Sequence, residues 1–208
     1  MKIAVLGSGA VGETLSNGFV QHGHEVVRGS REPAKLAAWK GGKAMTFGDA
    51  AAWGEVVVIA VKGTAAEELA GSLGKQLAGK VVVDTTNPIA DGGPQNGVLR
   101  YFTAQNESLM ERLQKAAPQA NFVKAWNSVG SAMMVNPKLP TTPTMFICGN
   151  DAGAKQTTTT LLGQLGYESC DCGGVEAARP IESLCMLWCI PGFMRNDWMH
   201  AFKLVSPA

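Results

Sequence analysis

The residues with the clearest chemical pattern read GSGAVG, from Gly7 to Gly12, and place glycines at the first, third and sixth positions. An apolar run, Ile3 to Leu6, precedes them, and apolar residues at helical spacing follow. In such a strand, turn and helix the first glycine permits the turn, the second lets backbone amides approach a pyrophosphate, and the third lets the helix pack closely on the strand. The helix N-terminus adds partial positive charge. The pattern predicts a dinucleotide site, with a ligand-free glycine turn as the alternative. The expected contacts are Gly7, Ser8, Gly9, Ala10, Val11 and Gly12.

A second candidate site follows the second expected strand, where positions 27 to 31 read Val, Arg, Gly, Ser, Arg. A fold that binds NAD carries an acidic residue about 20 positions after the glycines, which accepts from the ribose 2′-hydroxyl. This chain instead offers Ser30, Arg31 and, one helical turn further on, Lys35. Because guanidinium and ammonium groups suit a 2′-phosphate, the turn predicts NADP. The alternative is a solvated basic turn in which the adjacent Glu32 neutralises Arg31.

Further candidates lie at the carboxyl ends of the central strands. The runs EVVVIAV (55–61) and KVVVDTT (80–86) are rich in valine, which is typical of parallel strands covered on both faces. Ligands of doubly wound sheets bind beyond the carboxyl ends of such strands. The expected cofactor contacts there are Ala60, Val61, Lys62, Asn87 and Pro88, and the expected substrate pocket is Trp126, Asn127 and Ser128.

The chemistry that these residues suit is hydride transfer, which needs two rings held together in a dry pocket and no protein nucleophile. A ketone or imine acceptor would also need a proton donor, for which Lys62 is the candidate. A surface cation at a strand end is the alternative for Lys62. The three histidines form no recognisable nucleophile motif with a serine or cysteine, which argues against a hydrolase.

Composition limits the remaining possibilities. The chain has 208 residues, 46% of them hydrophobic and 17% charged, so we expect one globular domain over 1–208. A net charge of +1 argues against a nucleic-acid or anionic-membrane surface. No apolar run approaches the length of about 18 to 20 residues that crosses a bilayer, and the opening run is too short for a signal peptide. We therefore expect no membrane segment and a cytoplasmic protein. Its five cysteines are expected to be free thiols that hold no metal.

Strand and helix patterns alternate along the chain. Runs at 121–127 and 143–150 and a short one at YESCDC read as further strands, and the segment from Asp151 reads as a helix with Asp151 at its N-cap. The alternation predicts an α/β fold, a doubly wound, mainly parallel Rossmann sheet with short C-terminal helices.

Two segments interrupt this alternation. The loop 87–106 is too long for an ordinary connection and is either a functional loop over the crevice or a mobile surface loop. In the C-terminal helical segment 174–208, residues 184–190 are apolar on every helical face, so the helix must be buried. It packs either on its own domain or, as we expect, on a partner in a homodimer. Pro180 is expected in its first turn, and IPG at 190–192 is expected to break or kink it.

The chain resembles a known family in KIAVLGSGAVGETLSNGF, VVRGSREPAK, TTNP, VKAWNSVGSAMMVNP, TMFICGND and GGVEAARPIESL. These segments are similar to the NADPH-dependent reductases related to the F420:NADP oxidoreductases, a group that includes the cytosolic domain of membrane ferric reductases. The resemblance implies that Gly7, Gly9, Val11 and Gly12 hold the pyrophosphate. It further implies that Ser30, Arg31 and Lys35 hold the 2′-phosphate and that Asn87 and Pro88 border the nicotinamide.

The resemblance also implies a dimer that passes hydride between NADP(H) and a deazaflavin, coenzyme F420, or a flavin-type acceptor. Lys62-Gly63 departs from a Pro-Trp type turn of that family, and the loop 87–105 has no counterpart in it, so the acceptor stays open. Two alternatives remain. One is an NADP-dependent reductase of a small ketone, imine or hydroxy acid, and the other is an NADP(H)-binding sensor without turnover.

Overall fold

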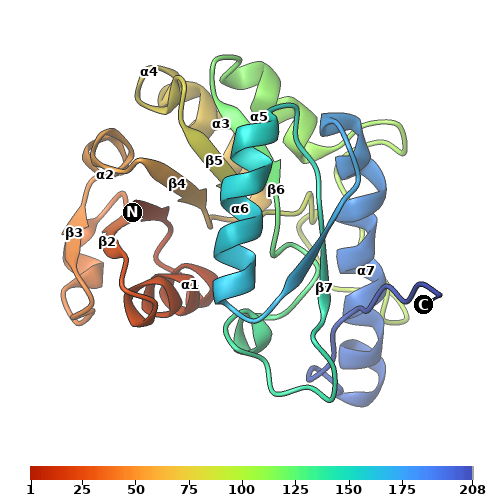
Figure 1. Cartoon of the computed structure of the whole chain (residues 1–208). Coiled ribbons are helices and arrows are strands. Elements are labelled where there is room, and N and C mark those ends of the chain that lie inside the picture. The colour runs from red at the N-terminus through yellow and green to blue at the C-terminus, as the bar shows by residue number, and fades with distance from the viewer. Residues whose placement is uncertain (208) are drawn as a thin grey trace.

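A six-stranded parallel sheet forms the centre of the molecule in a computed structural model that describes residues 1–207 (Figure 1). Its strand order is β3-β2-β1-β4-β5-β6, so the chain changes direction across the sheet between β1 and β4. In a doubly wound sheet the ligand crevice lies at this reversal, beyond the carboxyl ends of the strands. The predicted α/β fold is confirmed. The strands are β1 (Lys2–Leu6), β2 (Glu25–Gly29), β3 (Lys43–Met45), β4 (Val56–Ile59), β5 (Val81–Asp84) and β6 (Asn121–Lys124).

Helices cover both faces of this sheet because successive strand residues point to opposite sides. Val58 of β4 joins a core with α1 and α6, whereas the next residue, Ile59, joins a second core with α2, α3 and α5. Figure 1 shows α6 lying across the sheet and α7 along the margin of the molecule. The helices are α1 (Ala10–Gln21), α2 (Phe47–Trp53), α3 (Gly63–Ser72), α4 (Gly74–Leu77), α5 (Leu109–Ala116), α6 (Ala152–Gln164) and α7 (Ala178–Arg195). Three short 3-10 turns are η1 (Pro33–Leu36), η2 (Ser131–Met133) and η3 (Val175–Ala177).

The last two strands, β7 (Thr144–Ile147) and β8 (Glu168–Asp171), form a small parallel sheet of their own. A single antiparallel bridge between Lys124 and Cys148 joins it to the end of β6. The connecting helix α6 begins as expected, because the Asp151 side chain accepts a hydrogen bond from the amide of Ala154 at 2.7 Å. The strands expected at 143–150 and in YESCDC are therefore present.

The loop 87–106 is closed at its base by a short antiparallel bridge between Ile89 and Tyr101. The amide of Ala90 donates to the carbonyl of Arg100 at 2.8 Å, and the Tyr101 hydroxyl donates to the carbonyl of Glu182 in α7 at 2.6 Å. The Tyr101 ring is thereby anchored on the C-terminal helix, and burial raises the pKa of its hydroxyl. The loop is thus fastened to α7 at its base.

The C-terminal helix α7 continues through Pro191, so a break at 190–192 is wrong, whereas a kink there stays a prediction. Proline removes one backbone donor, and the carbonyl that loses its partner belongs to Leu187, which lies on the exposed side of the helix. Pro180 lies in the first turn, as expected. The helix buries one side against the domain, while Leu187, Phe193 and Met194 stay exposed. The single domain over 1–208 and a dimer partner for α7 stay predictions.

The described residues bear on three features expected from the composition, namely membrane spans, metal sites and disulfides. No helix within residues 1–207 combines the length and the apolar character needed to span a bilayer. The same residues contain no group of three or more His, Cys, Asp or Glu side chains placed to hold a metal ion. All five cysteines are free thiols. The cytoplasmic location stays a prediction.

Candidate functional site

The glycine turn fits tightly against its surroundings at two glycines and is open at the third. A Cβ atom on Gly7 would overlap the backbone carbonyl of Ala60, and one on Gly12 would lie 2.7 Å from the carbonyl oxygen of Gly7. On Gly9 it would meet no heavy atom of the described residues within 4 Å. The outer glycines are therefore required by packing, whereas Gly9 borders free space.

That free space lies at the N-terminus of α1. Gly9 is the N-cap of the helix, and no side chain within residues 1–207 caps it. Ser8 and Ala10 are exposed and Val11 is half-buried. Because the first amides of a helix have no intrahelical partner, they are available to an anion in front of the helix. The turn thus fits the pyrophosphate of a dinucleotide.

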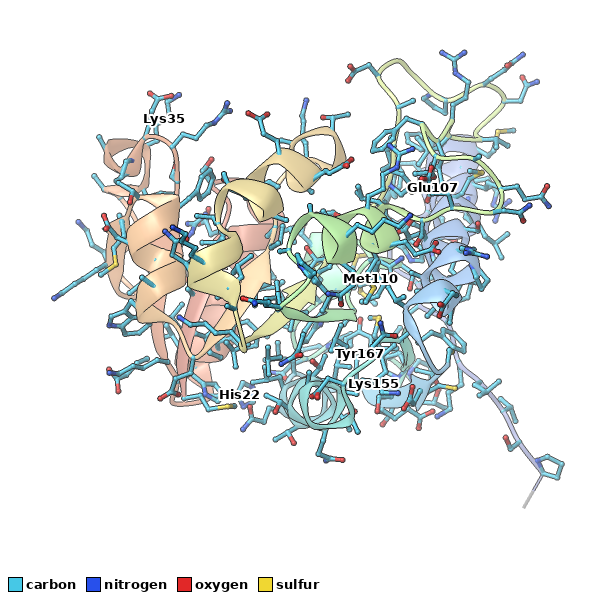
Figure 2. The ribbon with its side chains drawn as sticks, turned by 90° about the horizontal axis from the view of Figure 1, so that it is seen from above. His22, Lys35, Glu107, Met110, Lys155 and Tyr167 are labelled. Atoms are coloured by element: carbon cyan, nitrogen blue, oxygen red, sulfur yellow. The ribbon has the colours of Figure 1, made fainter. Side chains whose placement is uncertain are left out.

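The basic turn after β2 keeps one of its cations without an ion-pair partner. The ammonium of Lys35 lies 2.7 Å from the carboxylate of Glu32, and this hydrogen bond lowers the pKa of Glu32. Arg31 is exposed, and its side chain makes no ion pair with any residue that the structure describes. Glu32 therefore pairs with Lys35 instead of Arg31, and Figure 2 shows Lys35 at the outer edge of the molecule.

The third cation of this segment, Arg28, points inward. It is 2% exposed, donates to the carbonyl of Gly7 at 3.3 Å and lies under the ring of Trp39, 5.5 Å from its centroid. Burial lowers its pKa, and the nearby charge of Glu13 opposes that shift. Arg28 therefore supports the glycine turn from behind, so positive charge on the open surface of the turn comes from Arg31 and Lys35 only.

A cleft of about 460 Å³ opens at the carboxyl ends of β4 and β5. It brings together three of the predicted cofactor contacts, Val61, Lys62 and Asn87. Lys62 is exposed and forms the N-cap position of α3. The rest of the lining comes from the start of α3, the end of β5 and the loop, namely Gly63, Thr64, Thr85, Thr86, Ile89, Ala90, Asp91 and Gly92.

Five predicted site residues do not line this cleft. Ala60 is buried, and its backbone carbonyl lies against Gly7 of the glycine turn. Pro88 is buried beside the cleft, and Trp126, Asn127 and Ser128 are buried after β6. Trp126 has a φ of +55°, and its ring packs edge-on against Phe19 in the core, with ring centroids 6.0 Å apart. The residue follows an apolar strand, but the backbone turn directs its ring away from the cleft. Contact between these residues and a substrate stays a prediction.

Asn127 nevertheless reaches the cleft through Asn87. The Asn87 side-chain amide donates to the backbone carbonyl of Asn127 at 2.7 Å, and the Asn127 side-chain amide donates to Oδ1 of Asn87 at 3.1 Å. The Asn127 amide also donates to the carbonyl of Ile181 in α7 at 2.9 Å. The cleft wall at Asn87 is therefore connected to the C-terminal helix.

Behind the cleft floor lies a group of buried charges that the sequence reasoning missed. Lys124 is fully buried, and its ammonium contacts the carboxylates of Asp84 at 2.5 Å and Glu182 at 2.8 Å. Burial would lower the pKa of Lys124, but the two carboxylates outweigh it and the pKa is raised. We call these three residues the buried charge cluster.

A signal for this cluster was present in the sequence. Asp84 and Lys124 each end an apolar strand, and they are register partners in neighbouring strands. A charge on a strand covered on both faces requires an opposite charge, so the two ends could have been paired. The third member, Glu182, lies on a helix far along the chain, and no local pattern marks it.

Comparison with known proteins gives concordant matches. The family model described as "NADP oxidoreductase coenzyme F420-dependent" matches residues 2–88. The F420-dependent NADP reductase of Methanocaldococcus jannaschii is 30% identical over 200 residues, which cover 88% of this chain and 89% of that protein. A solved structure from Arthrobacter sp. FB24, provisionally described as an F420-dependent NADP reductase, has a TM-score of 0.89 and 32% identity and covers 99% of this chain and 100% of that one.

The chain is also similar to part of a larger protein. Metalloreductase STEAP3 of Rattus norvegicus is 31% identical over 186 residues, which cover 88% of this chain. The match spans only 36% of the metalloreductase. This similarity therefore concerns about a third of that protein's length.

Proposed function

Because the chain belongs to the family of coenzyme F420-dependent NADP oxidoreductases, we propose that it passes hydride between NADPH and a deazaflavin or flavin-type ring bound in the cleft. In that reaction NADPH gives up one hydride, which carries two electrons, and becomes NADP⁺. The acceptor ring takes the hydride and one proton from water. The family assignment makes the chain an NADP-dependent oxidoreductase, which argues against the sensor without turnover.

The nucleotide is proposed to lie along the carboxyl edge of the sheet. The pyrophosphate contacts the turn from Gly7 to Gly12, and the 2′-phosphate contacts Ser30, Arg31 and Lys35. The nicotinamide lies at the cleft, bordered by Asn87 and Pro88. The observation that carries this placement is the open space at Gly9 in front of uncapped helix amides, on the same sheet edge as the cleft.

The nature of the cleft wall supports a ring acceptor. Its polar side chains near the strand ends are mainly threonine and asparagine, which orient a ring by hydrogen bonds but are poor proton donors. Reduction of a ketone or imine remains the second candidate, because Lys62 lies at the rim of the cleft where it could donate a proton. A Lys62→Met variant separates the two. It should retain turnover with a ring acceptor and lose it with a carbonyl.

The deciding experiment offers F420, FMN, FAD, a ferric chelate and small carbonyls and imines in turn and measures NADPH oxidation. We expect the largest kcat/KM with F420 or a flavin and poor activity with NADH. Turnover confined to carbonyls or imines, and abolished in Lys62→Met, would establish the second candidate instead. Absence of NADPH binding by calorimetry would refute the placement altogether.

We also propose that the protein is a homodimer in which α7 meets the partner. Leu187 is 55% exposed and Met194 is 58% exposed, and both lie on a helix whose sequence is largely apolar. Exposed apolar patches of this kind mark contact surfaces.

Light scattering on a sizing column should give the mass of two chains for the unsubstituted protein and the mass of one chain for Leu187→Glu. The matched control is Leu204→Glu, which alters a residue of similar exposure outside α7. A monomer at micromolar concentration before any substitution would contradict the dimer.

A further inference from the structure

The buried charge cluster carries an excess of negative charge. The Glu182 carboxylate accepts from the amides of Leu109 at 2.9 Å and Met110 at 3.0 Å, in addition to its contact with Lys124. The Asp84 carboxylate accepts from the amide of Thr86 at 2.9 Å and from Lys124. The backbone amides and the ammonium can only donate hydrogen bonds, and such contacts suit charged carboxylates. With two carboxylates and one ammonium, the cluster has a formal net charge of −1.

The cluster lies immediately behind the cleft floor. Asp84 holds the amide of Thr86 and also its hydroxyl, at 2.7 Å, while Lys124 donates to the carbonyl of Thr86 at 2.9 Å. Thr86 itself lines the cleft together with Thr85 and Asn87. One residue therefore separates the buried charge from the space in the cleft, and the cluster fixes that residue at three polar atoms.

The second carboxylate is not needed to neutralise the ammonium. Asp84 and Lys124 alone form a neutral pair, and an additional buried carboxylate carries a large desolvation cost. The N-terminus of α5 offsets part of the Glu182 charge, because its partial positive charge is roughly half an elementary charge. A residual negative potential therefore remains at the cleft floor, in a protein interior where water screens it weakly.

We propose that Glu182, acting through this cluster, makes the cleft prefer the oxidised cofactor, NADP⁺, over NADPH. This inference rests on the proposed function, which places the nicotinamide in the cleft. When bound there, the cofactor supplies a ring that is neutral before hydride loss and positively charged after it. A fixed negative charge behind Thr86 stabilises only the charged form, so it favours hydride donation by differential binding. Glu182 contacts neither substrate nor cofactor and is a positioning residue that acts through Lys124 and Thr86.

The test compares binding of the two cofactor forms to Glu182→Gln, which keeps the side-chain shape and removes the charge. Dissociation constants for NADP⁺ and NADPH are measured by calorimetry on the whole protein, without an acceptor. We expect the dissociation constant of NADP⁺, divided by that of NADPH, to rise by about fivefold. This is the size expected when a unit charge that does not contact the ring is removed from a weakly screened site. If Glu182 had a purely structural role, the substitution would weaken the binding of both cofactor forms equally and leave the ratio unchanged.

The matched control is Glu111→Gln, which removes a carboxylate from the same contact between α5 and α7. The Glu111 charge is balanced by Arg179 at the surface, so the ratio should not change. Asp84→Asn is the second variant, because it removes the other buried carboxylate and should raise the ratio in the same direction if Glu182→Gln fails to fold. An unchanged or lowered ratio in a folded variant overturns the inference. Failure of the unsubstituted protein to bind NADPH would refute the proposed function instead.

Discussion

Asn87 and Asn127 bind each other reciprocally across the ends of β5 and β6, with each side-chain amide donating to the other residue. Asn87 lines the cleft, whereas Asn127 is buried and also donates to α7. The pair therefore connects the cleft wall to the C-terminal helix through one intermediate residue.

Asn127→Ala should destabilise the protein by about 1 to 3 kcal/mol, because it removes the side-chain amide that donates to Oδ1 of Asn87 and to the carbonyl of Ile181. Urea unfolding measures the loss. Asn106→Ala is the control, since Asn106 is exposed, and it should change the free energy of unfolding by less than about 0.5 kcal/mol. Equal effects of the two substitutions would contradict the role of the pair.

Gly9→Ala and Gly12→Ala should separate cofactor binding from stability. A Cβ on Gly9 enters open space, so the thermal midpoint of the free protein should stay nearly unchanged while NADPH binding weakens at least tenfold, by about 1.4 kcal/mol. A Cβ on Gly12 lies 2.7 Å from the Gly7 carbonyl oxygen, so this variant should lose stability without any ligand. Unimpaired NADPH binding by Gly9→Ala would place the pyrophosphate elsewhere.

Arg31→Ala should weaken NADPH binding by about 1 to 3 kcal/mol and leave NADH binding nearly unchanged, because only NADPH carries the 2′-phosphate. Lys35→Ala should have a smaller effect, since the Lys35 ammonium already pairs with Glu32. Calorimetry with both nucleotides measures the difference. If Arg31→Ala weakens the binding of both nucleotides alike, the proposed contact between Arg31 and the 2′-phosphate is wrong.

The ion pair between Glu111 and Arg179 should make the free energy of unfolding depend on pH. The hydrogen bond from Arg179 lowers the pKa of Glu111 from 4.5 to about 2. Because the folded pKa is depressed, the stabilisation is complete above the unfolded value near 4.5 and is lost as the pH falls toward 2. Because Arg179 is partly exposed, solvent screening reduces this stabilisation to about 1 to 2 kcal/mol. Glu111→Gln should lose that amount at pH 7 and match the unsubstituted protein in urea unfolding near pH 2. A difference that persisted at low pH would contradict this assignment.

Local patterns were sufficient to predict the sheet and the glycine turn. Valine-rich runs such as 55–61 place central strands, and the GSGAVG spacing has few structural explanations other than a strand-to-helix turn. The break at Pro191 was wrongly predicted, because a helix with other contacts tolerates one missing hydrogen bond.

The site was harder to predict than the fold. Trp126 follows a strand that reaches the crevice, but its positive φ directs the ring into the core, and no residue type in the sequence announces that turn. The pairing of Lys124 with Glu182 depends on how α7 docks, which is a tertiary fact. Contacts between distant segments, unlike strand and helix periodicity, leave no local pattern.

The turn of α7 at Ile181 and Glu182 receives hydrogen bonds from the loop 87–106, from α5, from Lys124 and from Asn127. A displacement of this helical turn would therefore disturb its hydrogen bonds to the loop, to α5, to Lys124 and to Asn127. If binding in the cleft stabilises α7, thermodynamic reciprocity requires that a partner bound to α7 changes the affinity of the cleft by the same factor. We therefore expect nucleotide addition to slow amide exchange in α7, because the helix shares these hydrogen bonds with the walls of the cleft.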